Sequence, residues 1–285
     1  MERPPAPRPA LPSTLGRLGR VAALLPLSGC ARQWQEWRLA ANRRDIERAT
    51  AAIAVARTDV ERARATSDRG AAYSERARYS RVFKLISPEE CARLFDLAVA
   101  DHDRAVALAP GDAGVYLQRG LAYYNRAALE ERADPSCARH FAAARDDFTR
   151  AVERDPDNEQ ALDMRGLVFT SLEDHDGAIR DFTAVMRLDP RLGRLRLAEE
   201  YCTRGGVNVR AKRYDLAIAD YERSISMNAP SDGCSCQPDS PLAWTYLETG
   251  QVEKSWATVR RAQRAHRWIM PELLERLRNV SGRNG

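Results

Sequence analysis

Residues 159–190 of the chain read EQALDMRGLVFTSLEDHDGAIRDFTAVMRLDP. Within this stretch Ala178 and Phe182 lie four residues apart, which places them one turn apart on the same face of a helix. Pro190 follows eight residues after Phe182, where such a helix would stop. Gly166 lies 12 residues before Ala178, on an earlier segment with the same helical period. The stretch therefore predicts two short helices that cross at small residues.

This arrangement occurs in four copies along the chain. Each copy carries an Arg-Gly pair on its first segment and, on its second, an alanine four residues before a ring. A recurring pattern of this kind indicates stacked supersecondary units. The small residues expected at the crossings are Gly70, Gly120, Gly166 and Gly205 on the first segments and Ala98, Ala144, Ala178 and Ala217 on the second, and the rings are His102, Phe148, Phe182 and Tyr221.

Residues 159–192 resemble a tetratricopeptide repeat, a helix-turn-helix unit of about 34 residues. The resemblance is carried by Gly166, Ala178, the rings Phe169 and Phe182, and Pro190, and it extends over roughly residues 59–262. In the fourth copy Asn208 replaces the aromatic residue expected after the Arg-Gly pair. The resemblance implies an all-α fold, a right-handed solenoid whose first helices line an extended concave surface.

The first two copies are longer than the third and fourth. Gly70 and Ala98 are 28 residues apart, and Gly120 and Ala144 are 24 apart, where the third copy has 12. Ser87-Pro88 and Asp134-Pro135 each combine a capping residue with a proline, which is typical of a helix start. The second helices therefore start early, and two elongated hairpins that stand side by side are predicted.

These observations predict the organisation of the whole chain. It comprises a leader at 1–29, an N-terminal helix at 30–58, elongated repeats at 59–112 and 113–158, regular repeats at 159–192 and 193–230, and a degenerate fifth repeat with a capping helix at 231–285.

The leader has the order of a secretion signal, with a basic region, a short apolar run and small residues. Its end, Leu27-Ser28-Gly29-Cys30, resembles a bacterial lipobox, which implies acylation of Cys30 and a lipid-anchored protein of the cell envelope, at the outer membrane or the periplasmic face. The alternative is a chance tetrapeptide in a cytoplasmic protein. Trp34 and Trp37 would rest either at a membrane interface or on the first repeat.

Charged residues recur in the same register as the rings. Each Arg-Gly pair has a counterpart in an aspartate that immediately precedes the ring of the second helix. Charge-assisted pairs between the helices are therefore expected, with a row of anion-binding arginines as the alternative. The pairs are Arg69 with Asp101, Arg119 with Asp147, Arg165 with Asp181, and Arg204 with Asp220.

Composition and motifs argue against several functions. The 285 residues are 44% hydrophobic and 30% charged, and the net charge of +5 resides mostly in the leader and the C-terminal tail, which does not favour a nucleic-acid partner. No apolar stretch approaches the roughly 20 residues of a membrane-spanning helix. No HExxH, GxSxG, GxGxxG or phosphate-loop motif occurs, so no catalytic residue, metal or cofactor is expected.

Cysteine pairing stays open at this point. Cys91 and Cys137 occupy equivalent positions in the first two repeats, and a bond between them requires the hairpin tips to converge. A bond from Cys202 to the loop that contains Cys234 and Cys236 is the other possibility.

Protein binding is the function that the resemblance implies, with a peptide or helix as the ligand of the concave face. The lysine, arginine and asparagine clamp of co-chaperone members is absent from this face. The alternatives are an assembly factor similar to the secretin pilotins, a regulatory subunit of an envelope enzyme, and a cytoplasmic adaptor. The expected partner-binding residues are Leu117, Leu121, Tyr124, Asn125, Asp163, Met164 and Leu167.

Overall fold

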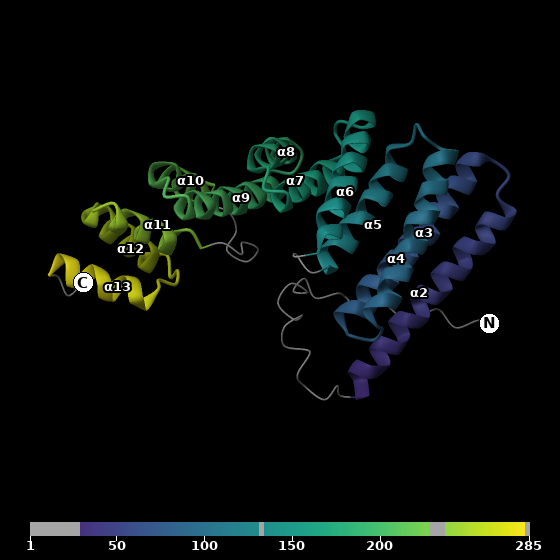
Figure 1. Ribbon diagram of the computed structural model, residues 1–285, viewed down its shortest axis with the longest axis horizontal. Helices are drawn as coiled ribbons and strands as arrows, with labels where there is room; N and C mark the ends of the chain where they lie inside the picture. Colours follow the sequence, from purple (N-terminus) through teal and green to yellow (C-terminus); the bar gives the residue numbers. More distant parts are fainter. Residues whose placement is uncertain (1–28, 131–133, 228–236, 283–285) are drawn as a thin grey trace, which may run out of the picture. The chain divides into compact units, whose positions relative to one another are not determined.

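The computed structural model describes residues 29–130, 134–227 and 237–282, with side chains from Trp34 onward. Every regular element of these residues is a helix (Figure 1). None of the helices is both long enough and apolar enough to cross a membrane. The helices are α2 (Gly29–Val55), α3 (Asp59–Val82), α4 (Pro88–Leu108), α5 (Ala113–Leu129), α6 (Pro135–Arg154), α7 (Glu159–Ser171), α8 (His175–Leu188), α9 (Pro190–Arg210), α10 (Tyr214–Ser226), α11 (Asp239–Glu248), α12 (Val252–Arg264) and α13 (Pro271–Ser281).

The chain forms two compact units. Unit 1 contains α2, α3, α4 and the end of α5 from Asn125, and unit 2 contains the start of α5 up to Tyr124 together with α6 to α13. Helices that follow one another in sequence pack side by side, as α3 does on α4 and α7 does on α8. The all-α fold expected from the repeats is therefore confirmed.

Several helix starts are fixed by local capping. Thr58 and Glu61 form a reciprocal capping box, in which the Thr58 side chain accepts from the Glu61 backbone N–H and the Glu61 carboxylate accepts from the Thr58 N–H. Ser87 and Asp134 cap α4 and α6, and a proline follows each. With 24 and 21 residues, α3 and α4 are much longer than α7 and α8, with 13 and 14. The first hairpin is thus elongated as the sequence predicts.

In each of the first four hairpins, the crossing of the first and second helices brings a ring onto a glycine. The ring of Phe182 lies so close to Gly166 that a Cβ atom there would be 2.4 Å from Phe182 Cε1. The alanines opposite, Ala98, Ala144, Ala178 and Ala217, are completely buried. A Cβ at Gly70, Gly120 or Gly205 would lie 2.8, 2.7 or 2.8 Å from the nearest ring atom of His102, Phe148 or Tyr221.

The boundary between the third and fourth repeats differs from the prediction. Pro190 does not close the third repeat but is the first residue of α9, capped by Asp189. The predicted boundary at 192/193 therefore falls inside this helix. Gly193 permits the early start, because a Cβ at this position would lie 2.2 Å from the Met186 Cα atom of α8.

The turns within the hairpins have a common backbone geometry. Lys84, Glu173 and Lys212 follow α3, α7 and α9, and all three have positive φ angles, of 54°, 61° and 57°. Gly250 takes this role after α11, with φ 74°. Only glycine adopts this region without a steric cost, so the three other turns carry some strain.

In unit 1, α2 packs on α3 through small and polar side chains. The buried side chains of α2 are Gln35, Asn42 and Ala49, spaced seven residues apart. One ion pair, between Arg38 and Glu75 at 2.8 Å, joins the two helices. Four buried side-chain oxygens in this region, on Asn42, Ser74, Tyr79 and Ser80, have no hydrogen-bond partner among the described residues. Apart from the packing of Trp34 on Tyr79 and Phe83 near the start of α2, this interface is therefore largely polar.

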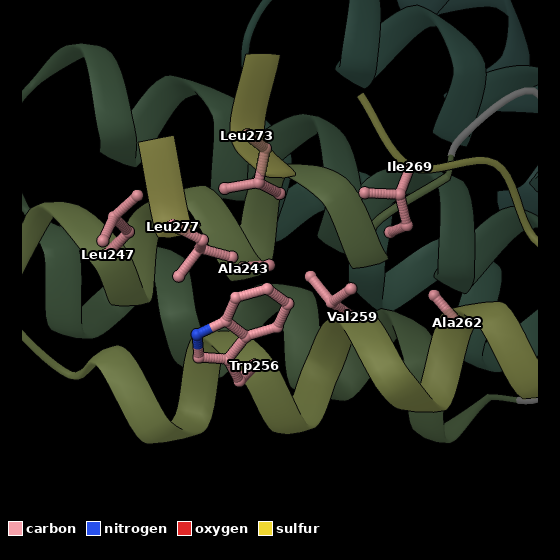
Figure 2. Packing of buried hydrophobic residues seen from close by; sticks show 8 residues of the cluster. All are labelled: Ala243, Leu247, Trp256, Val259, Ala262, Ile269, Leu273 and Leu277. Carbon is pink, nitrogen blue, oxygen red and sulfur yellow. The ribbon is translucent and has the colours of Figure 1, made fainter. Parts of the chain in front are cut away.

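In unit 2, α13 covers the end of the last hairpin. The ring of Trp256 on α12 faces Ala243 of α11 and Leu273 and Leu277 of α13 (Figure 2). Ser255 occupies the position where α12 crosses α11, in place of the alanine found in the other repeats. It is fully buried, and its hydroxyl donates to the Ala243 carbonyl at 2.6 Å. The degenerate fifth repeat thus keeps the helix pair and closes it with a third helix.

Adjacent glycines of α9 provide a test of the ring contact. We expect Gly205→Ala to destabilise the protein relative to Gly206→Ala by about 1–3 kcal/mol, the usual cost of overpacking. The reason is that a Cβ at Gly205 meets the Tyr221 ring at 2.8 Å, whereas one at Gly206 has its nearest neighbours at 3.8 Å. Both changes gain the same helix propensity, so their difference isolates the contact. Denaturant unfolding measures it, and equal stabilities for the two variants would contradict the packing argument.

Candidate functional site

The arginines of the four Arg-Gly pairs each contact the aspartate before the ring of their own repeat. In the third repeat Arg165 Nε and Nη2 donate to the two Asp181 carboxylate oxygens at 2.7 and 2.8 Å. Arg69 with Asp101 and Arg119 with Asp147 have the same two-pronged geometry, and Arg204 donates to Asp220 from Nε and Nη2. All four aspartates are buried. These arginines are therefore occupied within the repeats and do not form a row of anion-binding groups.

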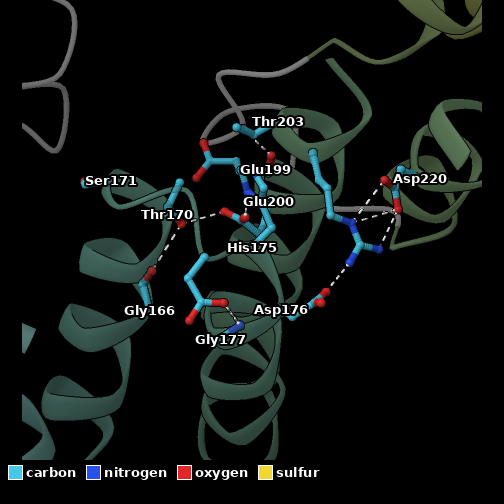
Figure 3. A network of polar contacts seen from close by, with 12 residues as sticks. Gly166, Thr170, Ser171, His175, Asp176, Gly177, Glu199, Glu200, Thr203 and Asp220 are labelled. Carbon is cyan, nitrogen blue, oxygen red and sulfur yellow. Dashed lines mark hydrogen bonds and ion pairs between the residues drawn. The ribbon is translucent and has the colours of Figure 1, made fainter. Parts of the chain in front are cut away.

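The fourth repeat adds further contacts to its pair. Asn208, in place of an aromatic residue, is buried and donates from Nδ2 to Asp220 at 2.9 Å. Arg204 also reaches Asp176 on α8 at 2.7 Å, so one guanidinium joins α8, α9 and α10 (Figure 3). Hydrogen bonding to Asp220 raises the pKa of Arg204. The asparagine thus completes a polar contact where an aromatic residue would have packed.

The predicted partner-binding residues divide into two groups. Leu117 and Asp163 are buried, which corrects their assignment to an accessible surface. Leu117 follows Val115 and Tyr116, which are also buried, so three consecutive side chains of α5 are covered by neighbouring residues. The remaining five are half-buried: Leu121, Tyr124, Met164 and Leu167 in unit 2, and Asn125 in unit 1.

Three first helices of unit 2 meet at a polar and aromatic cluster that we call the Tyr124 cluster, made of Tyr124, Asp163 and Arg196. Arg196 of α9 donates from Nε and Nη2 to the Asp163 carboxylate of α7 at 2.6 and 2.9 Å. The ring of Tyr124 on α5 packs edge-on against Phe141, with 5.9 Å between centroids. Burial raises the pKa of Tyr124, while the charge of Arg196 lowers this pKa and the charge of Asp163 raises it.

The Arg196–Asp163 pair was not predicted, although the sequence contains a signal for it. The two residues lie 33 positions apart, which is about one repeat, so opposite charges occupy near-equivalent positions of neighbouring first helices. The early start of α9 brings Arg196 into this register.

A second polar site lies between the third and fourth repeats. Glu200 of α9 is fully buried, contacts His175 Nδ1 at 2.6 Å and accepts from Thr170 Oγ1 at 2.5 Å (Figure 3). The other imidazole nitrogen, His175 Nε2, is buried and has no hydrogen-bond partner among the described residues. His175 lines an open cleft of about 460 Å³, a volume in the range typical of small-ligand clefts. The other lining residues are Glu173, Asp174, Asp176, Arg204, Val207, Asn208, Arg213, Leu216, Ala219 and Asp220.

The lining of this cleft contains no serine, threonine, cysteine or lysine that could serve as a nucleophile for the imidazole. Within the described part of the chain no cluster of histidine, cysteine and carboxylate side chains could hold a metal ion. Cys91 and Cys137 are buried thiols, and burial raises the pKa of Cys91. Cys202 is disulfide-bonded, and its partner lies outside the residues whose side chains are described. The predicted lipid site, Cys30, falls in the first turn of α2, and its side chain lies outside them as well.

Comparison with known proteins shows that several solved structures are similar to this chain. No protein-family model matches the chain, and no curated protein matches it either. A crystal structure of MamA is 16% identical, with 70% of this chain and 99% of that chain covered and a TM-score of 0.42. A tetratricopeptide repeat protein from Parabacteroides merdae is 14% identical, with 85% and 87% covered and a TM-score of 0.40.

A human IFIT1 dimer with PPP-AAAA is 16% identical, with 72% of this chain and 57% of that chain covered and a TM-score of 0.37.

The feature that decides the fold is internal to this chain, where helix hairpins repeat the contact of a ring with a glycine. The fold is that of the tetratricopeptide repeats. The resemblance noted in residues 159–192 is thereby confirmed at the level of fold.

The buried arginine pairs can be tested against an exposed one. We expect Arg165→Met to lower the free energy of unfolding by about 3–5 kcal/mol, because it leaves the buried Asp181 charge without its partner. Arg145→Met, which removes the exposed pair with Asp146, should change it by no more than about 1 kcal/mol. The double variant Arg165→Met/Asp181→Leu should regain much of the loss. Chemical denaturation measures all three, and a similar small effect at both arginines would show that the buried pairs do not stabilise the repeats.

Proposed function

We propose that this protein is a non-catalytic scaffold that binds a peptide or helix of another protein and is held at a bacterial envelope membrane by a lipid on Cys30. The binding part rests on one observation, that α5, α7 and α9 of successive repeats carry half-buried side chains next to the Arg196–Asp163 ion pair and Tyr124. A ligand lying across these helices would contact each repeat in turn, as extended ligands do on stacked repeats.

The chemistry of this surface suits a peptide. Leu121 lies one helical turn before Tyr124, and Met164 directly follows Asp163, so these two half-buried side chains offer apolar area near the cluster, whereas Leu167 packs partly on Phe182 and Leu197. The Tyr124 hydroxyl supplies a hydrogen-bond donor, and tyrosine is enriched among residues that dominate binding energy. The Asp163 and Arg196 charges are already paired with each other, so a strongly charged ligand gains little here. A peptide with one or two large apolar side chains and free backbone groups fits this surface best.

A photo-crosslinking amino acid tests the surface in cells. Placed at Met164 or Leu121, it should give adducts with one defined protein, because these side chains flank the Tyr124 cluster. The same label at Ile218, a half-buried position on the second helix α10, serves as the control and should not give that adduct. In addition, Met164→Glu should reduce the crosslink from Leu121, whereas Ile218→Glu should not. The same adducts from all three positions, or none from Met164 and Leu121, would refute this binding surface.

The anchor rests on the tetrapeptide Leu27-Ser28-Gly29-Cys30 after a basic and apolar leader. Acylation of Cys30 would place the lipid at the start of α2, the long helix that packs on the first hairpin. Two or three acyl chains at about 0.8 kcal/mol per buried methylene give firm anchoring. This supports an envelope protein held at the membrane from its N-terminal side.

Loss of the cysteine tests the anchor. We expect Cys30→Ala to abolish acylation and to shift the electrophoretic and intact mass, because the thiol is the attachment point. The variant should leave the membrane fraction or accumulate unprocessed, whereas Cys91→Ala, at a buried thiol, should do neither. Mass spectrometry and membrane fractionation measure both effects. An unchanged mass and unchanged fractionation for Cys30→Ala would exclude the lipid anchor.

A further inference from the structure

One end of unit 1 combines the start of α2 with the turn between α3 and α4. The ring of Trp34, in the second turn of α2, lies 5.7 Å from Tyr79 and 6.2 Å from Phe83 between centroids, at the end of α3. Tyr79 and Phe83 contact each other at 4.8 Å. The three rings join the two elements, and Figure 1 shows α2 beginning near the turn that follows α3.

Large apolar side chains are exposed at this end, which we call the aromatic end and define as Trp34, Trp37, Val82 and Leu85. Trp37 is 54% exposed and Val82 50%. Trp34 and Leu85 are also exposed, at about two fifths of their surface. Single exposed apolar residues are common, but a group of four from two elements, with two tryptophans among them, marks an interaction site.

The sequence position of this end identifies what it contacts. Trp34 and Trp37 follow Cys30 by four and seven residues on the same helix. At 1.5 Å per residue they lie about 6 and 10 Å from Cys30 along the axis. An acylated Cys30 would sit at the membrane surface, where the polar region of each leaflet is roughly 5–8 Å thick. Tryptophan is enriched at this depth.

We infer that the aromatic end is a second membrane contact, whose side chains insert among the phospholipid headgroups beside the lipid anchor. The inference rests on the proposed anchor, because the position of Cys30 is what brings the two tryptophans to the bilayer. A contact through two linked points is stronger than either alone, since the second forms at a high effective concentration. It also restrains unit 1, so that α2, α3 and α4 extend away from the bilayer and do not lie on it.

The charges of the described side chains around the aromatic end nearly balance. This balance indicates whether attraction to anionic lipid or apolar insertion drives the membrane contact. Glu75 accepts from Arg38 at 2.8 Å and from Arg78 at 2.7 Å, so these charges are already paired. Among the side chains that the structure describes, the basic ones near this end are Arg38, Arg78, Arg81 and Lys84, and the acidic ones are Glu36, Glu75, Glu89 and Glu90. Attraction to anionic lipid is therefore small, and apolar insertion is the driving force. Binding should then be similar on zwitterionic and anionic vesicles and persist at high salt, which screens exposed charges.

The test uses the full chain with Cys30→Ala, so that the result does not depend on acylation. We expect this protein to float with vesicles of phosphatidylcholine and with vesicles that contain phosphatidylglycerol, at low and at high salt. Brominated lipids should quench its tryptophan fluorescence. The quenching should fall in Trp37→Phe and remain in Trp268→Phe, at an exposed tryptophan of unit 2.

Glutamate substitutions with matched controls test whether the aromatic end contacts the membrane. Trp37→Glu and Val82→Glu should each weaken vesicle binding about tenfold or more, the effect of removing one large apolar side chain from an apolar contact. Trp268→Glu and Leu97→Glu, at side chains that are 59% and 49% exposed elsewhere, should leave it unchanged. All these variants carry the same leader, so a contribution of the leader cancels. Equal binding by all of them, or binding only to anionic vesicles with loss at high salt, overturns the inference.

The outcome also separates this inference from the proposed anchor. Acylation is read independently, from the mass of the unaltered chain. An acylated Cys30 together with no vesicle binding by the Cys30→Ala chain overturns the membrane contact and leaves the anchor. Vesicle binding that depends on Trp37, together with an unmodified Cys30, overturns the anchor and supports the contact.

Discussion

The contact between a ring on a second helix and a glycine on the first sets the geometry of the first four repeats. It fixes how closely the two helices approach, and the buried alanines opposite follow from the same closeness. It also explains the charge pairs. An arginine immediately precedes each of these glycines and an aspartate immediately precedes each ring, so the glycine contact brings both charged residues face to face. A pair such as Arg165 with Asp181 is thus placed in register by the neighbouring packing.

Contacts between repeats are less regular than those within them. Arg204 of α9 pairs with Asp176 of α8, Arg196 of α9 pairs with Asp163 of α7, and the Thr170 hydroxyl of α7 donates to Glu200 of α9. Buried ion pairs contribute little net stability because desolvation offsets their attraction. Their geometric demands, however, penalise a shifted stack, in which an aspartate would be buried without its partner. The irregular contacts therefore specify which helix lies beside which.

Local signals in the sequence predicted local structure well. The caps at Thr58, Ser87 and Asp134 depend on neighbouring residues only, and the spacing from Gly166 to Phe182 depends on one helix pair. The burial of Leu117 and the register of Arg196 depend on how separate elements pack, which a single helical period does not encode. The start of α9 at Pro190 required knowledge of the close approach at Gly193. Likewise, Glu173 and Lys212 adopt positive φ angles, and no glycine at these positions predicts this turn conformation from the sequence.

The largely polar interface between α2 and α3 has a mechanical consequence. In the proposed lipid-anchored protein, a pull on a bound partner would reach the bilayer through α2. Among the described side chains of α2 the buried ones are Gln35, Asn42 and Ala49, and Arg38 pairs with Glu75 of α3, whereas aromatic packing on α3 is confined to Trp34 near the start of the helix. Under shear this interface would yield before the hairpins, whose rings and glycines interlock. The first helix would then act as a load-limiting joint, which lengthens the tether and spares the repeats.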